Sequence, residues 1–247
     1  MPDKIKIKKS EITFAVIVVF ISGFAAGTYF DQRAQEQLRH PDIGGEIVAN
    51  MLLPAVDSEG NGVVGTLSTT VKPGTGKILV DASRVLNYLD IQLSARVAAT
   101  AASNYAKVNL SNLDIIYTIK VNASIIEGPS AGASMALSVL LALENMTADD
   151  IAITGTINAD GSIGKVGSIL EKGRVAKDNG AKMYMVPAGQ STIESTVRNT
   201  TCSRAGAMDV CKVNYISETI NIGQYLGMEV HEVRNLHEAY QHFNRTV

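Results

Sequence analysis

The sequence of 247 residues predicts an α+β fold. Apolar strands joined by turn residues dominate the stretch from residue 47 to residue 80, and segments with helical spacing begin at residue 83. From there strands and helices follow each other without the regular alternation of a doubly wound sheet. Because 46% of the residues are hydrophobic, the chain can bury a substantial core.

Turn residues separate the predicted elements. Residues 58–62 join two strands as a β-hairpin, and Asp160-Gly161 predicts a second hairpin within residues 157–167. The predicted strands are residues 47–56, 63–71, 78–80, 115–121, 151–155, 182–186 and 229–233. The predicted helices, from apolar spacing and capping residues, are 83–105, 130–143, 168–179, 192–199 and 235–243.

The N-terminal segment predicts a membrane anchor. Residues 12–30 are largely apolar and uncharged, and these 19 residues in a helix would span the roughly 30 Å of a bilayer core. The preceding basic residues 1–11 stay cytoplasmic by the positive-inside rule, so the rest of the chain is exported. We expect a single-pass signal-anchor in the cell membrane; a signal peptide cleaved near residues 25–27 is the alternative. Residues 31–45 predict a linker, and residues 46–247 an extracytoplasmic domain.

Composition argues against several classes of protein. The net charge is −2 and no basic stripe is interleaved with aromatic residues, which argues against nucleic-acid binding. Histidines and cysteines form no ligand pattern, so we predict no metal site and no cofactor. Cys202 and Cys211 could close a small disulfide loop in an exported protein, or be two unrelated thiols.

The candidate chemistry lies in residues 127–134, which run Glu-Gly-Pro-Ser-Ala-Gly-Ala-Ser between a predicted strand and a predicted helix. This arrangement puts Ser130 at a helix N-terminus, where backbone N–H groups and the helix dipole favour a developing negative charge. A nucleophilic hydroxyl beside an oxyanion site would be presented in this way. The alternative is a serine that only caps the helix.

A serine nucleophile needs a base, and no histidine lies between His40 and His231. Lys172, near the start of the predicted helix 168–179, is the candidate. Burial and the positive end of the helix would both disfavour its ammonium form. Lys165 and Lys177 are expected to face solvent, and the alternative for Lys172 is an ordinary surface lysine.

These motifs resemble the proteolytic domain of Lon proteases. The matching segments, in the family's order and spacing, are Glu-Gly-Pro-Ser-Ala-Gly at 127–132, Ile-Thr-Gly-Thr-Ile at 153–157, Gly-x-Ile-x-x-Val-Gly at 161–167 and Leu-Glu-Lys at 170–172. The segments 71–79 and 182–187 also match, so the resemblance covers residues 46–243. It implies the Lon proteolytic fold with hairpins and βα units, and a serine endopeptidase with a Ser–Lys dyad.

The resemblance also implies roles for individual residues. Ser130 would attack the peptide carbonyl, and Lys172 would act as general base and then as acid. Thr154 would hydrogen-bond the lysine. The turn that contains Gly128 and Ala131 would supply backbone N–H groups to the oxyanion, and Glu127 would affect loop conformation.

Two departures from the family are Thr156, where glutamate is usual, and Ser168, where glycine or a small residue is usual. The 247 residues hold no ATPase module, so we expect ATP-independent cleavage of unfolded or flexible polypeptides near the membrane. The resemblance implies a homo-oligomeric ring. One alternative is a catalytically weak Lon-like domain that binds peptides or partner proteins. Another is a small-molecule kinase, which would need acidic metal ligands and more glycines in the turn than Gly128 and Gly132.

Overall fold

The computed structural model describes residues 17–23, 39, 41, 43–82, 88–122, 129–206 and 208–244. The chain divides into two units, residues 1–40 and 41–247. In the first unit, residues 17–23 form a helix with exposed side chains. No helix in the described ranges is long and apolar enough to cross a membrane. The rest of the predicted span 12–30 lies outside those ranges.

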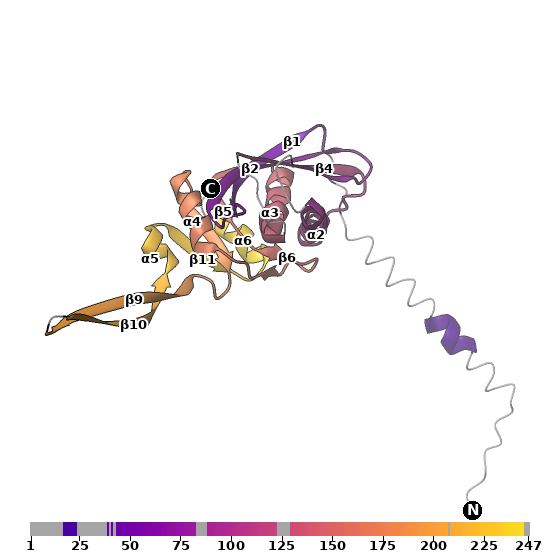
Figure 1. The fold of residues 1–247 in the computed structure, drawn as a ribbon. Coiled ribbons are helices and arrows are strands. Elements are labelled where there is room, and N and C mark those ends of the chain that lie inside the picture. Colours follow the sequence, from indigo (N-terminus) through magenta and orange to yellow (C-terminus); the bar gives the residue numbers. More distant parts are fainter. Residues whose placement is uncertain are drawn as a thin grey trace, which may run out of the picture. The chain divides into compact units, whose positions relative to one another are not determined.

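A seven-stranded mixed sheet forms the centre of the second unit (Figure 1). Its strand order is β11-β8-β5-β1-β2-β4-β3. The strands are β1 (Ile47–Val56), β2 (Gly62–Pro73), β3 (Ile78–Ala82), β4 (Leu113–Val121), β5 (Ala148–Ile153), β8 (Met183–Pro187) and β11 (Glu229–Val233). The pairs β1/β2 and β2/β4 are antiparallel, and the other neighbours are parallel. The fold is therefore a mixed α/β fold, with the predicted hairpin and βα units in one sheet.

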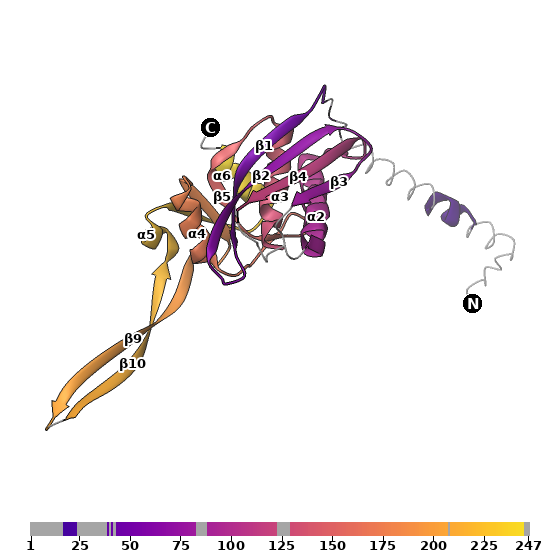
Figure 2. The same cartoon turned by 45° about the horizontal axis from the view of Figure 1, so that its top comes forward.

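Helices cover both faces of this sheet. The helices are α2 (Tyr88–Ala106), α3 (Gly132–Leu143), α4 (Ile169–Asp178), α5 (Ile222–Leu226) and α6 (Leu236–Asn244). Side chains alternate between the two faces of a strand. Accordingly Ile153 and Met185 pack in one core cluster with α2, α3 and α6, while their neighbours Ala152 and Tyr184 pack in a second cluster with α4 and α5. Figure 2 shows α2 and α3 together on one side of β1, β2 and β4.

α3 is the central helix of the larger cluster. The eleven residues from Gly132 to Ala142 are all buried, including two serines. A helix that is apolar or small on every side belongs in a core, and this is why residues 130–143 fold as predicted. A 3₁₀ turn, η1 (Pro129–Ala131), leads into the helix.

The C-terminal third contains a long hairpin that the sequence did not predict. The polar helix predicted at 192–199 is wrong, because β9 (Thr192–Ala205) pairs with β10 (Met208–Asn221) in a long antiparallel hairpin. Threonine, valine and isoleucine supply six of the residues from 192 to 201, and β-branched residues favour strands. Cys202 and Cys211 face each other across this hairpin and form a disulfide.

The remaining predicted elements are present, β1 and β11 with the predicted ends and the others with shifted ends. Strand β5 ends at Ile153, so Thr154 and Gly155 lie beyond it rather than within it. The short strands β6 (Thr156–Ile157) and β7 (Ile163–Gly164) form the second predicted hairpin. Helix α2 begins at Tyr88, and residues 83–87 of the predicted helix lie outside the described ranges. Helix α5 was not predicted.

Glu232 of β11 makes the stability of this unit sensitive to acid. Its Oε1 accepts hydrogen bonds from the hydroxyl of Ser191 at 2.6 Å and from the Ser191 backbone N–H at 2.9 Å. Hydrogen bonds from Ser191 and from neighbouring backbone amides lower the pKa of this carboxyl from 4.5 to about 2. Because the folded pKa lies below the unfolded one, the stabilisation is complete above pH 4.5 and is lost as the pH falls toward 2.

We therefore predict that Glu232→Gln reduces the loss of unfolding free energy between pH 7 and pH 3. The amide cannot titrate, so this part of the pH dependence disappears. Urea unfolding at the two pH values measures the effect. Glu194→Gln, on the exposed hairpin strand β9, is the control and should behave as the wild type. Equal pH dependence in wild type and Glu232→Gln would contradict the prediction.

Candidate active site

The turn that carries Ser130 is fixed to a rigid helix. Ser130 and Ala131 of η1 are 8% and 7% exposed, and α3 follows them directly. Since α3 is buried along its length, the turn cannot shift without disturbing the core. Glu127 and Gly128 of the predicted site lie outside the described ranges.

Reciprocal hydrogen bonds join this turn to the segment that follows β5. The backbone N–H of Gly155 donates to the carbonyl of Ser130 at 3.0 Å, and the N–H of Ala133 donates to the carbonyl of Gly155 at 3.0 Å. The hydroxyl of Thr154 also donates to the Ser130 carbonyl, at 3.4 Å. Thr154 is 1% exposed. Thr154 and Ser130 therefore belong to one hydrogen-bonded unit.

Two glycines permit this close approach. A Cβ atom on Gly132 would lie 2.8 Å from Cγ2 of Ile157 and 3.0 Å from its backbone nitrogen. Gly155 has φ +155, and a Cβ there would lie 2.5 Å from Cγ2 of Ile163. Side chains at these two positions would push the turn and the β6–β7 hairpin apart.

Lys172 lies on α4, and its side chain is fully buried. Over the described ranges it is the one buried residue among the lysines, arginines, aspartates and glutamates. Lys165 and Lys177 are exposed, as predicted. A lysine is rarely buried in full, because burying an ammonium group costs free energy.

Close packing holds α4 in place. A Cβ on Gly62, at the start of β2, would lie 2.5 Å from the carbonyl oxygen of Glu171. A Cβ on Gly173 would lie 2.7 Å from Leu226 and 2.9 Å from Tyr184. The helix begins after Ser168, which has the left-handed conformation at φ 54 that glycine adopts more easily.

Two of the elements that carry the predicted residues contact β1, and the third follows its neighbour β5. Both η1 and α4 contact β1. Thr154 follows β5, the parallel neighbour of β1, and its backbone N–H donates to the carbonyl of Met185 at 3.1 Å. The structure thus brings Ser130 and Thr154 into direct contact and places Lys172 on α4, which contacts the same strand β1 as η1. Thr154 was expected to contact the lysine; its described hydrogen bond goes to the Ser130 carbonyl.

Sequence reasoning missed Gly155 and Ser134 as parts of this arrangement. Gly155 is part of the Thr-Gly motif, but we assigned it no role. A glycine after a buried strand signals a close approach of another part of the backbone. Ser134 follows Ser130 by four residues, which is one helical turn, and that spacing could have shown a shared face.

The described histidines contact groups outside the predicted catalytic set. His231 bonds Glu229 at 2.5 Å and stacks on His242, with ring centroids 4.1 Å apart. His237 contacts the hydroxyl of Tyr105 at 3.3 Å. Across the same ranges, no group of three His, Cys, Asp or Glu residues could hold a metal ion.

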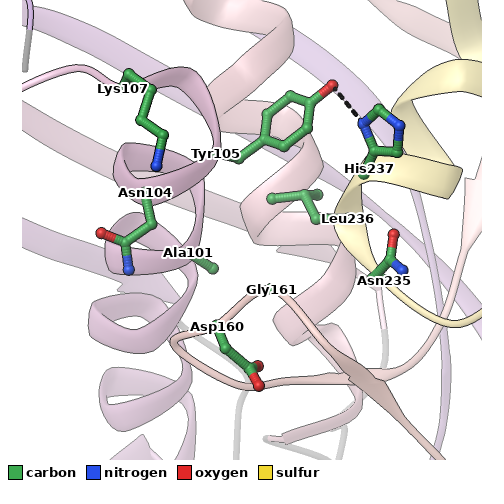
Figure 3. A pocket seen from close by; sticks show the side chains of 9 residues that line it. All are labelled: Ala101, Asn104, Tyr105, Lys107, Asp160, Gly161, Asn235, Leu236 and His237. Carbon is green, nitrogen blue, oxygen red and sulfur yellow. Dashed lines mark hydrogen bonds between the residues drawn. The ribbon is translucent and has the colours of Figure 1, made fainter. Parts of the chain in front are cut away.

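A cavity of about 310 Å³ lies at the end of α2, between the β6–β7 turn and the start of α6 (Figure 3). It is lined by Ala101, Asn104, Tyr105, Lys107, Asp160, Gly161, Asn235, Leu236 and His237. Figure 3 shows the contact between Tyr105 and His237 at its rim. None of these residues belongs to the predicted catalytic set, so the cavity is separate from the Ser130 turn.

A family model of the Lon protease (S16) C-terminal proteolytic domain matches residues 60–226, which include Ser130, Thr154 and Lys172. The chain belongs to this family. The family consists of serine-type peptidases. The resemblance seen in the sequence motifs is thereby confirmed.

Curated relatives agree with this assignment. An archaeal Lon protease of Archaeoglobus fulgidus is 27% identical over 171 residues, 67% of this chain and 26% of the relative. An archaeal Lon protease of Thermococcus kodakarensis is 27% identical over 221 residues, 87% of this chain and 33% of the relative. Lon protease 2 of Bacillus subtilis is 36% identical over 63 residues, 25% of this chain and 11% of the relative. The chain thus matches about a third or less of each relative's length.

We predict that Gly155→Ala destabilises the domain by about 1–3 kcal/mol, because the new Cβ meets Ile163 and the backbone is unfavourable for alanine. Urea unfolding measures the change. Gly167→Ala is the matched control, since nothing lies within 4 Å of a Cβ at that position. Similar unfolding free energies for the two variants would show that Gly155 is not constrained.

Proposed function

We propose that this chain is a serine endopeptidase in which Ser130 and Lys172 form a catalytic dyad. The observation that carries the proposal is the full burial of Lys172 in a domain of a serine-peptidase family. Burial stabilises neutral amine relative to ammonium, and only a neutral amine can accept a proton. An ordinary surface lysine does not meet this requirement.

In the proposed reaction the amine of Lys172 takes the proton of the Ser130 hydroxyl as Oγ attacks the peptide carbonyl. The carbonyl oxygen gains negative charge, which the N-terminus of α3 and the backbone N–H groups of the turn stabilise. Lys172 then protonates the leaving amine, and the C–N bond breaks to leave an acyl-enzyme. Attack of water, with Lys172 again as base, releases the acid and restores Ser130.

Thr154 has the chemistry to align the dyad. Its hydroxyl donates to the carbonyl of Ser130, and a hydroxyl that donates one hydrogen bond can still accept others. We propose that it accepts one from the Lys172 amine. This bond would point the nitrogen lone pair at the serine.

The recessed position of Ser130 supports flexible polypeptides as substrates. A nucleophile that is 8% exposed is reached by an extended segment and not by a rigid folded surface. None of the proposed steps consumes a nucleotide, so hydrolysis is expected without ATP. A homo-oligomeric ring, implied by the family resemblance, stays a prediction.

The dyad predicts the behaviour of three variants. Ser130→Ala and Lys172→Met should each lower hydrolysis of fluorescein-labelled casein by at least about 10³-fold without ATP. Methionine matches the length of lysine, so Lys172→Met should stay folded. Lys165→Met, an exposed lysine, should retain wild-type activity. A fluorophosphonate probe should label the wild type and not Ser130→Ala.

Unchanged casein hydrolysis in Ser130→Ala and Lys172→Met would contradict the dyad. If the wild type binds casein but neither cleaves it nor reacts with the probe, the chain is instead a peptide-binding Lon-like domain.

We also propose that residues 12–30 anchor the chain and that the catalytic domain is extracytoplasmic. The charge and hydropathy pattern of residues 1–30 supports this orientation. The Cys202–Cys211 disulfide supports it independently, because structural disulfides persist mainly in oxidising compartments.

This topology predicts that a tag after residue 247 is digested when protease is added to intact cells. A cytoplasmic marker protein in the same sample should survive until the membrane is lysed. A tag that resists digestion before lysis and is lost after it would contradict the exported orientation.

A further inference from the structure

We infer that Ser134 is a positioning residue for the nucleophile, an inference that rests on the proposed function of Ser130. Ser134 is fully buried on α3, one helical turn after Ser130. Its Oγ donates to the backbone carbonyl of Ile153 at 2.7 Å. Ile153 is the last residue of β5, directly before Thr154.

This bond is unusual for a buried serine in a helix. Such a hydroxyl commonly donates to a carbonyl one turn back in its own helix. Ser138, the next buried serine of α3, does so, since its Oγ donates to the carbonyl of Met135 at 2.8 Å. Ser134 instead bonds a different element, at the residue where β5 leads into the site.

The Ser134 bond fixes the register of α3 against the end of β5. It is shorter than the other described hydrogen bonds between the two segments. Those are the two backbone bonds of Gly155, each at 3.0 Å, and the bond from the Thr154 hydroxyl to the Ser130 carbonyl, at 3.4 Å. The Ser134 bond is also the contact that a side-chain substitution can delete without altering the turn itself. Loss of this bond frees the segment that follows β5, with Thr154, to shift relative to the fixed helix α3, and misplacement of a catalytic group by about 1 Å can cost 10²-fold in rate.

Ser138 supplies a matched control. It is equally buried on the same helix, and its Oγ also lies 2.6 Å from the hydroxyl of Thr69 on β2. Its removal therefore deletes buried hydrogen bonds of similar kind in the same core. None of its described hydrogen bonds goes to residues 153–157.

The test compares Ser134→Ala, Ser134→Thr and Ser138→Ala in the full chain. Each is measured below its unfolding transition for kcat and KM on labelled casein and for the rate of fluorophosphonate labelling. We expect Ser134→Ala to lower kcat and the labelling rate by about 10- to 100-fold, with KM within about twofold. Ser134→Thr keeps the hydroxyl and should recover most of the rate. Ser138→Ala should keep wild-type kcat even where its unfolding temperature falls.

Equal kcat and labelling rates in Ser134→Ala and Ser138→Ala would overturn the inference. It would also be overturned if Ser134→Ala loses activity and a folded Ser134→Thr variant does not recover it. Failure of the proposed function has a different signature, because either the wild type would neither cleave casein nor react with the probe, or Ser130→Ala would retain wild-type hydrolysis. If Ser134→Thr does not fold, Ser134→Cys, which keeps a weaker donor of similar size, replaces it and should recover part of the labelling rate.

Discussion

Burial of α3 on every side is the constraint on which the candidate site depends. A helix with one exposed face can tilt or slide at low cost, whereas a helix packed all round moves only if its neighbours repack. Ser130 sits at the N-terminus of this helix, so its position is set by the core of the domain rather than by a surface loop. The glycines at 132 and 155 extend the constraint beyond the helix, because they let the turn and the segment after β5 approach within hydrogen-bonding distance.

The burial of Lys172 is a second constraint on the fold, in addition to the burial of α3. The two constraints are linked through the central sheet. Removing an ammonium group from water is costly, so the fold must gain enough elsewhere to keep Lys172 inside. The packing of α4 offers that gain. Gly62 and Gly173 allow the helix to lie directly against β2, Leu226 and Tyr184. A neutral amine reduces the cost further, and this is the state that a general base requires. The neutral amine that the proposed dyad requires is thus the form that burial disfavours least.

The sequence predicted those parts of the molecule in which local pattern and tertiary environment agree. The β1–β2 hairpin follows from its turn residues, and α3 from a run of small and aliphatic residues. The predicted helix at 192–199 failed because its polarity suggested a solvated helix, while its threonines and valine fit a strand paired with β10. The partners of Thr154 and Ser134 depend on how β5 ends against α3, and no spacing along the chain encodes a contact between two elements that meet only in the folded core.

The proposed nucleophile is recessed, and this would place the selection of substrates outside the turn that carries it. Because α3 cannot move without repacking, a folded surface would not reach Ser130 in the proposed enzyme, and the substrate would have to supply the flexibility instead. A stable globular protein exposes an extended segment only in the small fraction of molecules that are unfolded, about 10⁻³ to 10⁻⁶ of the population. Under the proposed function, discrimination by several orders of magnitude between folded and unfolded chains would need no recognition of sequence. It would follow from the 8% exposure of Ser130 and from the free energy of unfolding of the substrate.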